Sequence, residues 1–214
     1  MIKIYEAEMK LDLISFLLKE QPRTFIIGSE VPVNQSENLV DILKISKRAC
    51  HAYEIKSDQD NFIRLPKQIE TYTSLFDYTS VVVSKANYHK IIKEIPKKIG
   101  ILVIDENHVV TIKRKATKIL RLNKMGLAKL LWKNELINIL QDKQIGTKKE
   151  LNKLSDVTLR QILVSILTTK ELKNLSYKHL LTRYVYKYKN FMGNIGLELL
   201  KDDLLELSLK NQSI

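Results

Sequence analysis

The segment Tyr53–Ser57, with the sequence YEIKS, places a carboxylate and an ammonium group two residues apart in what reads as an interior strand. Alternate side chains of a strand share one face, so Glu54 and Lys56 are predicted to point the same way. Asp41 lies inside the apolar run 38–45, which is predicted to be the neighbouring strand. Two carboxylates on adjacent strands can supply oxygen ligands to Mg²⁺ or Mn²⁺. A lysine beside them can orient an attacking water and offset charge on a phosphoryl transition state.

The spacing of Glu54 and Lys56 is not specific on its own. The same acid-x-Lys pattern occurs at Glu8-Met-Lys10 and at Glu171-Leu-Lys173, both on expected helices, where such residues do not face each other. The plain alternative for Glu54 and Lys56 is a salt bridge that contributes little to stability. The surrounding residues therefore decide between the two interpretations.

The hydrophobic pattern predicts an α/β fold in which helices flank a mixed sheet. Helical spacing of apolar residues predicts a first helix over 4–20. Three strands follow, with polar turns at 34–37 and 46–49, which favours an antiparallel meander. A capping box at Ser57 and Asp60 predicts a helix that carries apolar residues from Phe62 to Phe76. The remaining elements are predicted as strand 79–84, a short helix over 87–96, and strands 100–105 and 108–113. The helix between the third and fourth strands predicts a parallel βαβ unit.

An Asp on one strand, Glu-x-Lys on the next and Gln68-x-x-x-Tyr72 on the following helix resemble the PD-(D/E)XK, or restriction-endonuclease-like, nuclease superfamily. The segment QIETY is similar to a motif of its RecB-like branch, and the run from Glu54 to Val83 resembles small bacterial members of the superfamily, some of them linked to mobile elements. The resemblance covers roughly residues 5–115. It departs from the family pattern at Val40, where a proline often precedes the aspartate.

The resemblance implies that Asp41 and Glu54 bind the metal and that Lys56 is the catalytic lysine. It also implies an earlier acid that completes the metal site, for which Glu30 is the candidate and Glu8 the other contender. Gln68 is expected to position the lysine, the water or a phosphate. Arg64 and Tyr72 are expected to contact nucleic acid, with a helical surface position for Arg64 and a core position for Tyr72 as the alternatives.

A net charge of +12 and a pI near 9.6 point to a polyanionic partner. Eight basic residues and no acid lie between Lys113 and Lys133. The basic residues expected to contact nucleic acid are Lys113, Arg114, Lys115, Lys118, Arg121 and Lys124. A solvated basic face is the alternative. The resemblance favours DNA over RNA, whereas the residues themselves do not distinguish the two.

After about residue 118 the strand pattern stops, and residues 119–214 are predicted to form an all-α basic extension to a nuclease-like domain at 1–118. Residues 147–163 are expected to form two short helices joined at Ser155. The acidic, leucine-rich segment Gly196–Leu209 could pack on these helices or on a second subunit to form a homodimer. No apolar run is long enough to span a membrane, the first residues lack a signal-peptide pattern, and the lone Cys50 excludes an internal disulfide. A cytoplasmic protein is expected.

The sequence therefore predicts a Mg²⁺- or Mn²⁺-dependent nuclease that hydrolyses phosphodiester bonds. The alternative is a catalytically silent nucleic-acid-binding module that keeps the nuclease-like fold.

Overall fold

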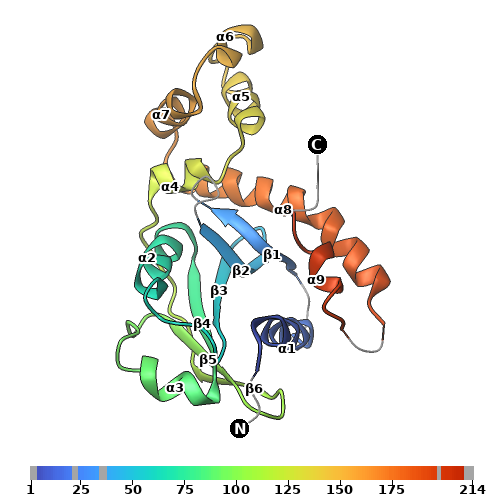
Figure 1. The fold of residues 1–214 in the computed structure, drawn as a ribbon. Coiled ribbons are helices and arrows are strands. Elements are labelled where there is room, and N and C mark those ends of the chain that lie inside the picture. The colour runs from blue at the N-terminus through green and yellow to red at the C-terminus, as the bar shows by residue number, and fades with distance from the viewer. Residues whose placement is uncertain (1–3, 21–23, 34–37, 197–198, 210–214) are drawn as a thin grey trace.

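The computed structural model describes residues 4–20, 24–33, 38–196 and 199–209. In this part of the chain one six-stranded sheet forms the centre of the molecule, with the strands in the same order in space as in sequence (Figure 1). The strands are β1 (Ile26–Val33), β2 (Asn38–Ile45), β3 (Cys50–Lys56), β4 (Tyr78–Ser84), β5 (Gly100–Ile104) and β6 (Val110–Arg114). The turn expected at 34–37 lies outside the described residues.

The sheet is mixed, as the sequence predicts. β1, β2 and β3 pair antiparallel, β3, β4 and β5 pair parallel, and β6 returns antiparallel to β5. The parallel pairs need crossover connections, and helices α2 (Leu65–Leu75) and α3 (Lys85–Ile91) provide them. The predicted order of helices and strands over the first half of the chain is therefore confirmed.

The two faces of the sheet bury different sets of apolar residues because side chains alternate along each strand. Val81 and Val83 of β4 pack with the helices α2 and α3 in a smaller cluster. Val82 belongs to the larger core, to which α1 (Glu6–Leu18) contributes a stripe that includes Leu13 and Leu17. The sheet is thereby covered on both sides, and polar residues on its strands are enclosed.

Two helix boundaries differ from the prediction. Ser57 and Asp60 form a hydrogen-bonded turn, with the Ser57 hydroxyl 2.6 Å from Asp60 Oδ2, but no helix follows directly. α2 begins only at Leu65, where Pro66 suits the first turn of a helix. α3 ends at Ile91 instead of continuing to Pro96. The capping-box pattern is wrong here because the same side-chain bonds also close a turn that is not continued as a helix.

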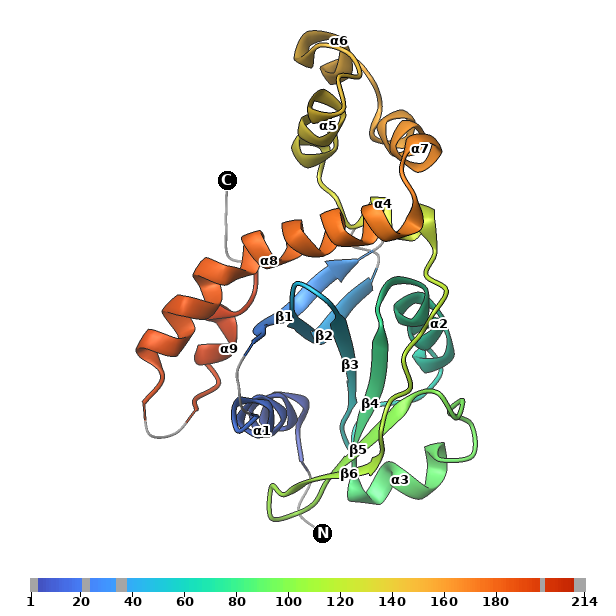
Figure 2. The same cartoon turned by 180° about the vertical axis from the view of Figure 1, so that it is seen from behind.

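The second half of the chain is helical, as predicted. Its helices are α4 (Lys124–Lys129), α5 (Lys133–Asp142), α6 (Lys148–Asn152), α7 (Asp156–Ile166), α8 (Thr169–Asn194) and α9 (Asp203–Glu206). α5, α6 and α7 form an arm that projects from the sheet in both views (Figures 1 and 2). Ser155 caps α7 by accepting from the Thr158 backbone N–H, so the joint between α6 and α7 falls where the sequence predicts it.

The helical half is not separate from the sheet. α8 lies across β1 and β2 (Figure 1), and buried residues from both halves, including Ile27 and Tyr184, belong to one hydrophobic cluster. A Cβ atom added to Gly28 would lie 2.8 Å from the Tyr184 ring, so the absent side chain is what lets α8 approach β1 this closely. Residues 1–118 therefore share their core with the helices that follow.

None of the helices in the described ranges combines the length and the apolar character that crossing a membrane requires.

Candidate active site

The predicted pair of acids lies where β2 and β3 stop pairing. The ladder between these strands runs from Ile45 opposite Cys50 to Ile42 opposite Tyr53. One further step along this register would bring Asp41 opposite Glu54. There Asp41 Oδ2 accepts a hydrogen bond from the Ile55 backbone N–H at 2.7 Å. The side chain thus replaces a backbone partner, and the strands end their pairing around the two carboxylates.

Glu54 and Lys56 do share one face of β3. Lys56 Nζ lies 2.7 Å from Glu54 Oε1, and Lys56 and Glu54 are only 6% and 2% exposed. The salt bridge expected as the plain alternative is therefore present, but it is buried and lies beside a second carboxylate. Removing both charges from water is costly, and a simple surface ion pair would not require it.

Tyr72 holds Glu54 from helix α2. Its hydroxyl lies 2.8 Å from Glu54 Oε2 and 2.7 Å from the Leu39 carbonyl oxygen, two acceptors between which it shares its proton. Burial and the nearby charge of Glu54 raise the pKa of Tyr72, so the hydroxyl remains a donor. Tyr72 is fully buried. The expectation that it contacts nucleic acid is therefore wrong, and its role is to orient Glu54.

Asp41 is the most strongly perturbed carboxyl group of the site. Burial, followed by the negative charge of Glu54, raises the pKa of Asp41 to about 8, against the opposing effects of Lys10 and the Ile55 N–H. Two neighbouring carboxylates in one recess repel each other, so a positive charge added between them stabilises their ionised forms. The electrostatics therefore suit a cation between Asp41 and Glu54.

Helix α2 completes the recess. Gln68 and Arg64 line it together with Asp41, Glu54 and Lys56, and its volume is about 300 Å³. Gln68 Oε1 is buried and accepts no hydrogen bond from any described residue, although a buried acceptor normally has a donor. The structure thus brings four predicted site residues and Arg64 into one recess, with one acceptor left for a ligand or water.

Glu30, expected to complete the metal site, lies outside this recess. It adopts a left-handed backbone conformation (φ 49°) at the interruption of the β1–β2 ladder, and its carboxylate lies 3.3 Å from Lys10 Nζ. Glu8 has a different role, because it caps α1 through the Tyr5 N–H. Among the described residues, no three His, Cys, Asp or Glu side chains gather closely enough to hold a metal ion.

Lys10 is the site residue that the sequence reasoning did not identify. It is 5% exposed on the buried face of α1 and lies 2.7 Å from Glu6, and its positive charge acts on Asp41. A signal was present, because Lys10 falls on the same helical stripe as Leu13, Ile14 and Leu17. A lysine within such a stripe indicates a buried partner.

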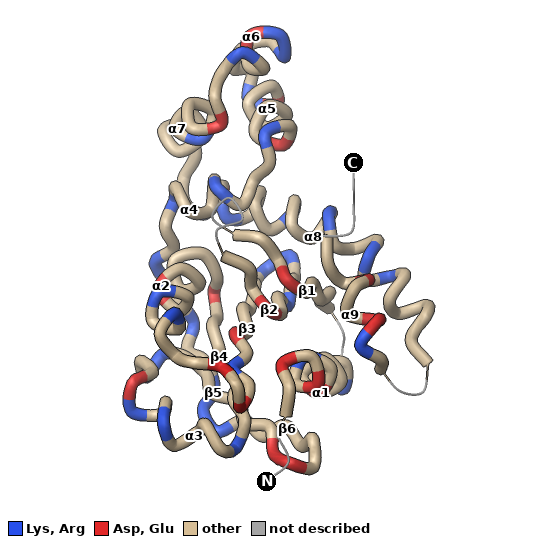
Figure 3. Tube along the Cα trace, viewed as in Figure 1, with Lys and Arg blue, Asp and Glu red and all other residues tan. Residues whose placement is uncertain are grey.

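The expected nucleic-acid contacts differ in how accessible they are. Lys113, Lys115, Lys118 and Arg121 are exposed, and Lys124 is partly exposed. Arg114, in contrast, donates to the backbone carbonyls of Ile99, Ile95 and Pro96, and so holds the loop before β5. Figure 3 shows acidic residues on α1, β1 and β2, with basic residues spread over the helices. The recess is lined by four acids and two basic residues, whereas the basic segment 113–133 holds no acid.

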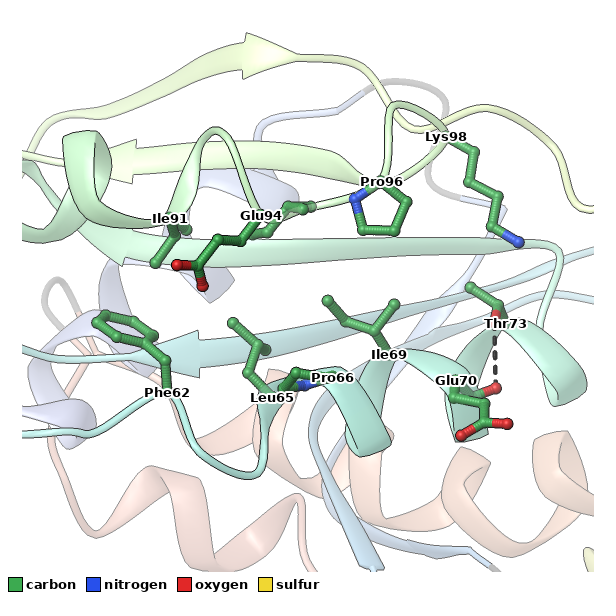
Figure 4. A pocket seen from close by; sticks show the side chains of 11 residues that line it. Phe62, Leu65, Pro66, Ile69, Glu70, Thr73, Ile91, Glu94, Pro96 and Lys98 are labelled. Carbon is green, nitrogen blue, oxygen red and sulfur yellow. Dashed lines mark hydrogen bonds between the residues drawn. The ribbon is translucent and has the colours of Figure 1, made fainter.

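The opposite face of α2 borders a second recess of about 310 Å³ (Figure 4). Leu65 and Ile69 from α2 face Ile91 and Pro96 across it, while Glu70, Glu94 and Lys98 stand around it. It lacks the paired buried acid and lysine of the first recess. The candidate chemistry is therefore confined to the side of α2 that carries Gln68 and Tyr72.

Fold and site together define a mixed α/β protein with a buried acid–lysine recess at the end of two central strands. Residues 2–208 match the sequence model of the family described as bacteriophage P4 protein cII, and the chain belongs to this family. It is 26% identical over 210 residues to Protein cII of Enterobacteria phage P4, covering 95% of this chain and 77% of that protein.

A solved structure, described as SPO1766 protein of unknown function from Silicibacter pomeroyi, is similar to part of the chain. It is 20% identical and covers 56% of this chain and 80% of its own, with a TM-score of 0.38.

Proposed function

We propose that this protein is a divalent-metal-dependent nuclease that hydrolyses phosphodiester bonds with a restriction-endonuclease-like site. The observation that carries the proposal is the single recess that contains Asp41, Glu54, Lys56 and Gln68, contributed by β2, β3 and α2. A structural salt bridge accounts for Glu54 and Lys56 alone. It does not account for a second carboxylate and an unbonded amide oxygen beside them.

The donor set fits a hard cation. Asp41 and Glu54 would hold Mg²⁺ or Mn²⁺, which bind oxygen ligands and commonly take few from the protein. When bound, such an ion polarises a phosphoryl oxygen and makes a bound water more acidic. Glu6 and Asp60 also line the recess, but no three acids of the described chain gather closely enough to hold a metal ion, so the remaining ligands would come from water and substrate.

The side chains of the recess can perform the rest of the chemistry. The Lys56 ammonium group, which is fixed by Glu54, can offset charge that develops on the phosphoryl group. The Gln68 amide oxygen can accept a hydrogen bond from the attacking water and so orient it. Arg64 lines the recess from the start of α2 and can pair with a phosphate.

The exposed cations after β5 would bind the nucleic-acid backbone. Contacts from Lys113, Lys115, Lys118 and Arg121 would be independent of sequence and sensitive to salt. DNA is proposed as the substrate because the sequence resembles the PD-(D/E)XK nuclease superfamily.

The test is to incubate the full-length protein with circular plasmid, linear duplex and single-stranded DNA, in Mg²⁺, Mn²⁺ or EDTA. Asp41→Asn, Glu54→Gln and Lys56→Met variants should each lose about a hundredfold or more of the activity. Lys85→Met, which removes an exposed lysine paired with Glu106, is the matched control and should cut normally.

Cleavage that survives in EDTA or in the three site variants would refute the proposed site. If no DNA is cut while salt-sensitive binding persists, the silent nucleic-acid-binding module becomes the better description.

A further inference from the structure

Helix α8 has an exposed side that the proposed chemistry does not use. Five exposed residues follow one another at intervals of four along this side: Asn174, Lys178, Thr182, Tyr186 and Asn190. Residues four apart are neighbours on a helix surface, so these side chains form one stripe, the outer stripe of α8. The opposite side of the helix packs on the core that covers the sheet (Figures 1 and 2).

The helix carries positive charge that is only partly neutralised. Residues 172–197 include five basic side chains and no acid. Three acids of other elements bond to side chains of the helix: Asp77, Glu135 and Glu206. The first two pair with Lys173 and Arg183, and the third accepts a hydrogen bond from Asn194 at the end of the helix. Three cations form no salt bridge within the described part of the chain: Lys178, Lys187 and Lys189.

Tyr186 gives this cationic surface an aromatic ring. It is 70% exposed, whereas Tyr184 and Tyr188 on either side of it are buried. Lys178 lies on the same stripe, and Lys189 is exposed one turn further along. Unpaired bases stack on such rings while lysines contact the phosphates, a combination typical of single-strand binding. A duplex keeps its base faces stacked inside, so an exposed ring on a helix surface suits an unpaired strand.

The two other exposed aromatic side chains of the described chain have different surroundings. Tyr5 is 51% exposed and is followed closely by the acids Glu6 and Glu8. Trp132 is 45% exposed, but the Arg183 guanidinium lies 4.1 Å from the centre of its ring and covers one face. Among these three rings, the one next to unpaired lysines is Tyr186.

We propose that the outer stripe of α8 binds single-stranded nucleic acid. Tyr186 stacks on one base, and Lys178 and Lys189 contact the phosphates on either side of it. This inference rests on the proposed function, because that proposal makes nucleic acid the ligand, and it adds a preference for unpaired strands.

The experiment compares two labelled strands of equal length that carry the same phosphates, oligo-dT and a fully abasic strand. Binding of the full chain to each is followed by fluorescence anisotropy in EDTA, so that no metal-dependent cleavage intervenes. Wild type should bind oligo-dT about 5-fold to 150-fold more tightly, which is the effect of stacking one base. Tyr186→Ala should remove this preference and leave the affinity for the abasic strand unchanged, whereas Tyr186→Phe should keep the preference.

The lysines should affect both strands alike. A Lys178→Met, Lys189→Met double variant should weaken binding of oligo-dT and of the abasic strand by the same factor. It should also reduce the steepness of the salt dependence by about 0.7 for each phosphate contact that is lost. Tyr5→Ala is the matched control, because it removes an exposed tyrosine beside acids, and it should change neither affinity.

The outcomes separate this inference from the proposed function. Equal affinity of wild type for the two strands, or a preference that persists in Tyr186→Ala, would overturn the role of the outer stripe and leave the nuclease proposal standing. A preference that depends on Tyr186, in a protein that cuts no DNA with any metal, would support the stripe and count against the nuclease. Binding to phosphatidylserine vesicles that is lost in Tyr186→Ala, without a preference for oligo-dT, would make the stripe a membrane-binding surface instead.

Discussion

Asp41 is the side chain whose charge state depends most on its surroundings. Its carboxyl group accepts the Ile55 N–H and lies beside Glu54, in a recess that raises its pKa to about 8. An acid with a raised pKa keeps its proton in the folded state at pH values where the unfolded chain has lost it. Folding is therefore opposed increasingly as the pH rises through this window.

This gives a prediction for Asp41→Asn in the presence of EDTA. The amide can still accept the Ile55 N–H but does not ionise. Between pH 3.8 and about 8, the free energy of unfolding of wild type should fall relative to the variant. The slope within this window should be negative and no steeper than about 1.4 kcal/mol for each pH unit. Urea unfolding at a series of pH values measures it, and parallel curves for the two proteins would contradict the assignment.

At the scale of single residues, the sequence identifies the residues of the site better than it identifies the side chains that they contact. Alternation along β3 is enough to place Glu54 and Lys56 on one face, and they are found there. Lys10 could not be placed in the same way, because its acidic partner Glu30 lies on another element and reaches it through an unusual backbone conformation. Tyr72 fits both a core and a surface position by its spacing, and only the packing of α2 shows it to be buried.

The elements show a similar division between what local sequence specifies and what packing decides. Strands β2 and β4 could be predicted almost to the residue because their apolar runs match the buried faces of a central sheet. The start of α2 could not be predicted in this way, because the hydrogen bonds between Ser57 and Asp60 are compatible with both a turn and a helix cap. The point where β2 and β3 stop pairing is set by the side chain of Asp41, and no periodicity in the sequence predicts it.

A buried ion pair connects the start of β4 to helix α8. Asp77, just before β4, is 1% exposed, accepts the Cys50 N–H and lies 2.5 Å from Lys173 Nζ. Sequence reasoning treated the pattern that contains Lys173 as unremarkable, because Asp77 is distant in the chain. The pair connects the sheet to the helix that covers it.

Lys173→Met should therefore destabilise the protein by about 3–5 kcal/mol, since it leaves a buried carboxylate without its counter-ion. Lys170→Met, one turn earlier on the exposed side of α8, should change stability by no more than about 0.5 kcal/mol. Chemical denaturation of both variants at neutral pH provides the comparison. Equal stabilities would show that solvent reaches Asp77 and replaces the lysine.

At the scale of the whole molecule, acidic and basic residues are interspersed along most of the backbone (Figure 3). The segment 113–133 differs, because it holds eight basic residues and no acid, and its Lys113, Lys115, Lys118 and Arg121 are exposed. Composition indicates a polyanionic partner, but it does not show that Arg114 is engaged with backbone carbonyls. The accessible lysines of this segment are the ones that binding should depend on.

Replacing both Lys115 and Lys118 by alanine should weaken duplex DNA binding and flatten its dependence on salt. The logarithm of the binding constant should fall less steeply with the logarithm of salt concentration, by about 0.9 for each phosphate that is no longer neutralised. Fluorescence anisotropy over a range of salt concentrations measures the slope. Lys85→Ala should leave the slope unchanged, and an unchanged slope in the double variant would place the DNA-binding surface elsewhere.

The close approach of Gly28 and Tyr184 has a consequence for how the chain is made. β1 and β2 leave the ribosome well before α8, the helix that covers them, has been synthesised. At about 5–20 residues per second, the growing chain exposes the apolar face of these strands for roughly 8 to 30 s. During this interval the nascent protein presents a hydrophobic surface that chaperones can bind, and slowing translation before residue 169 should prolong it.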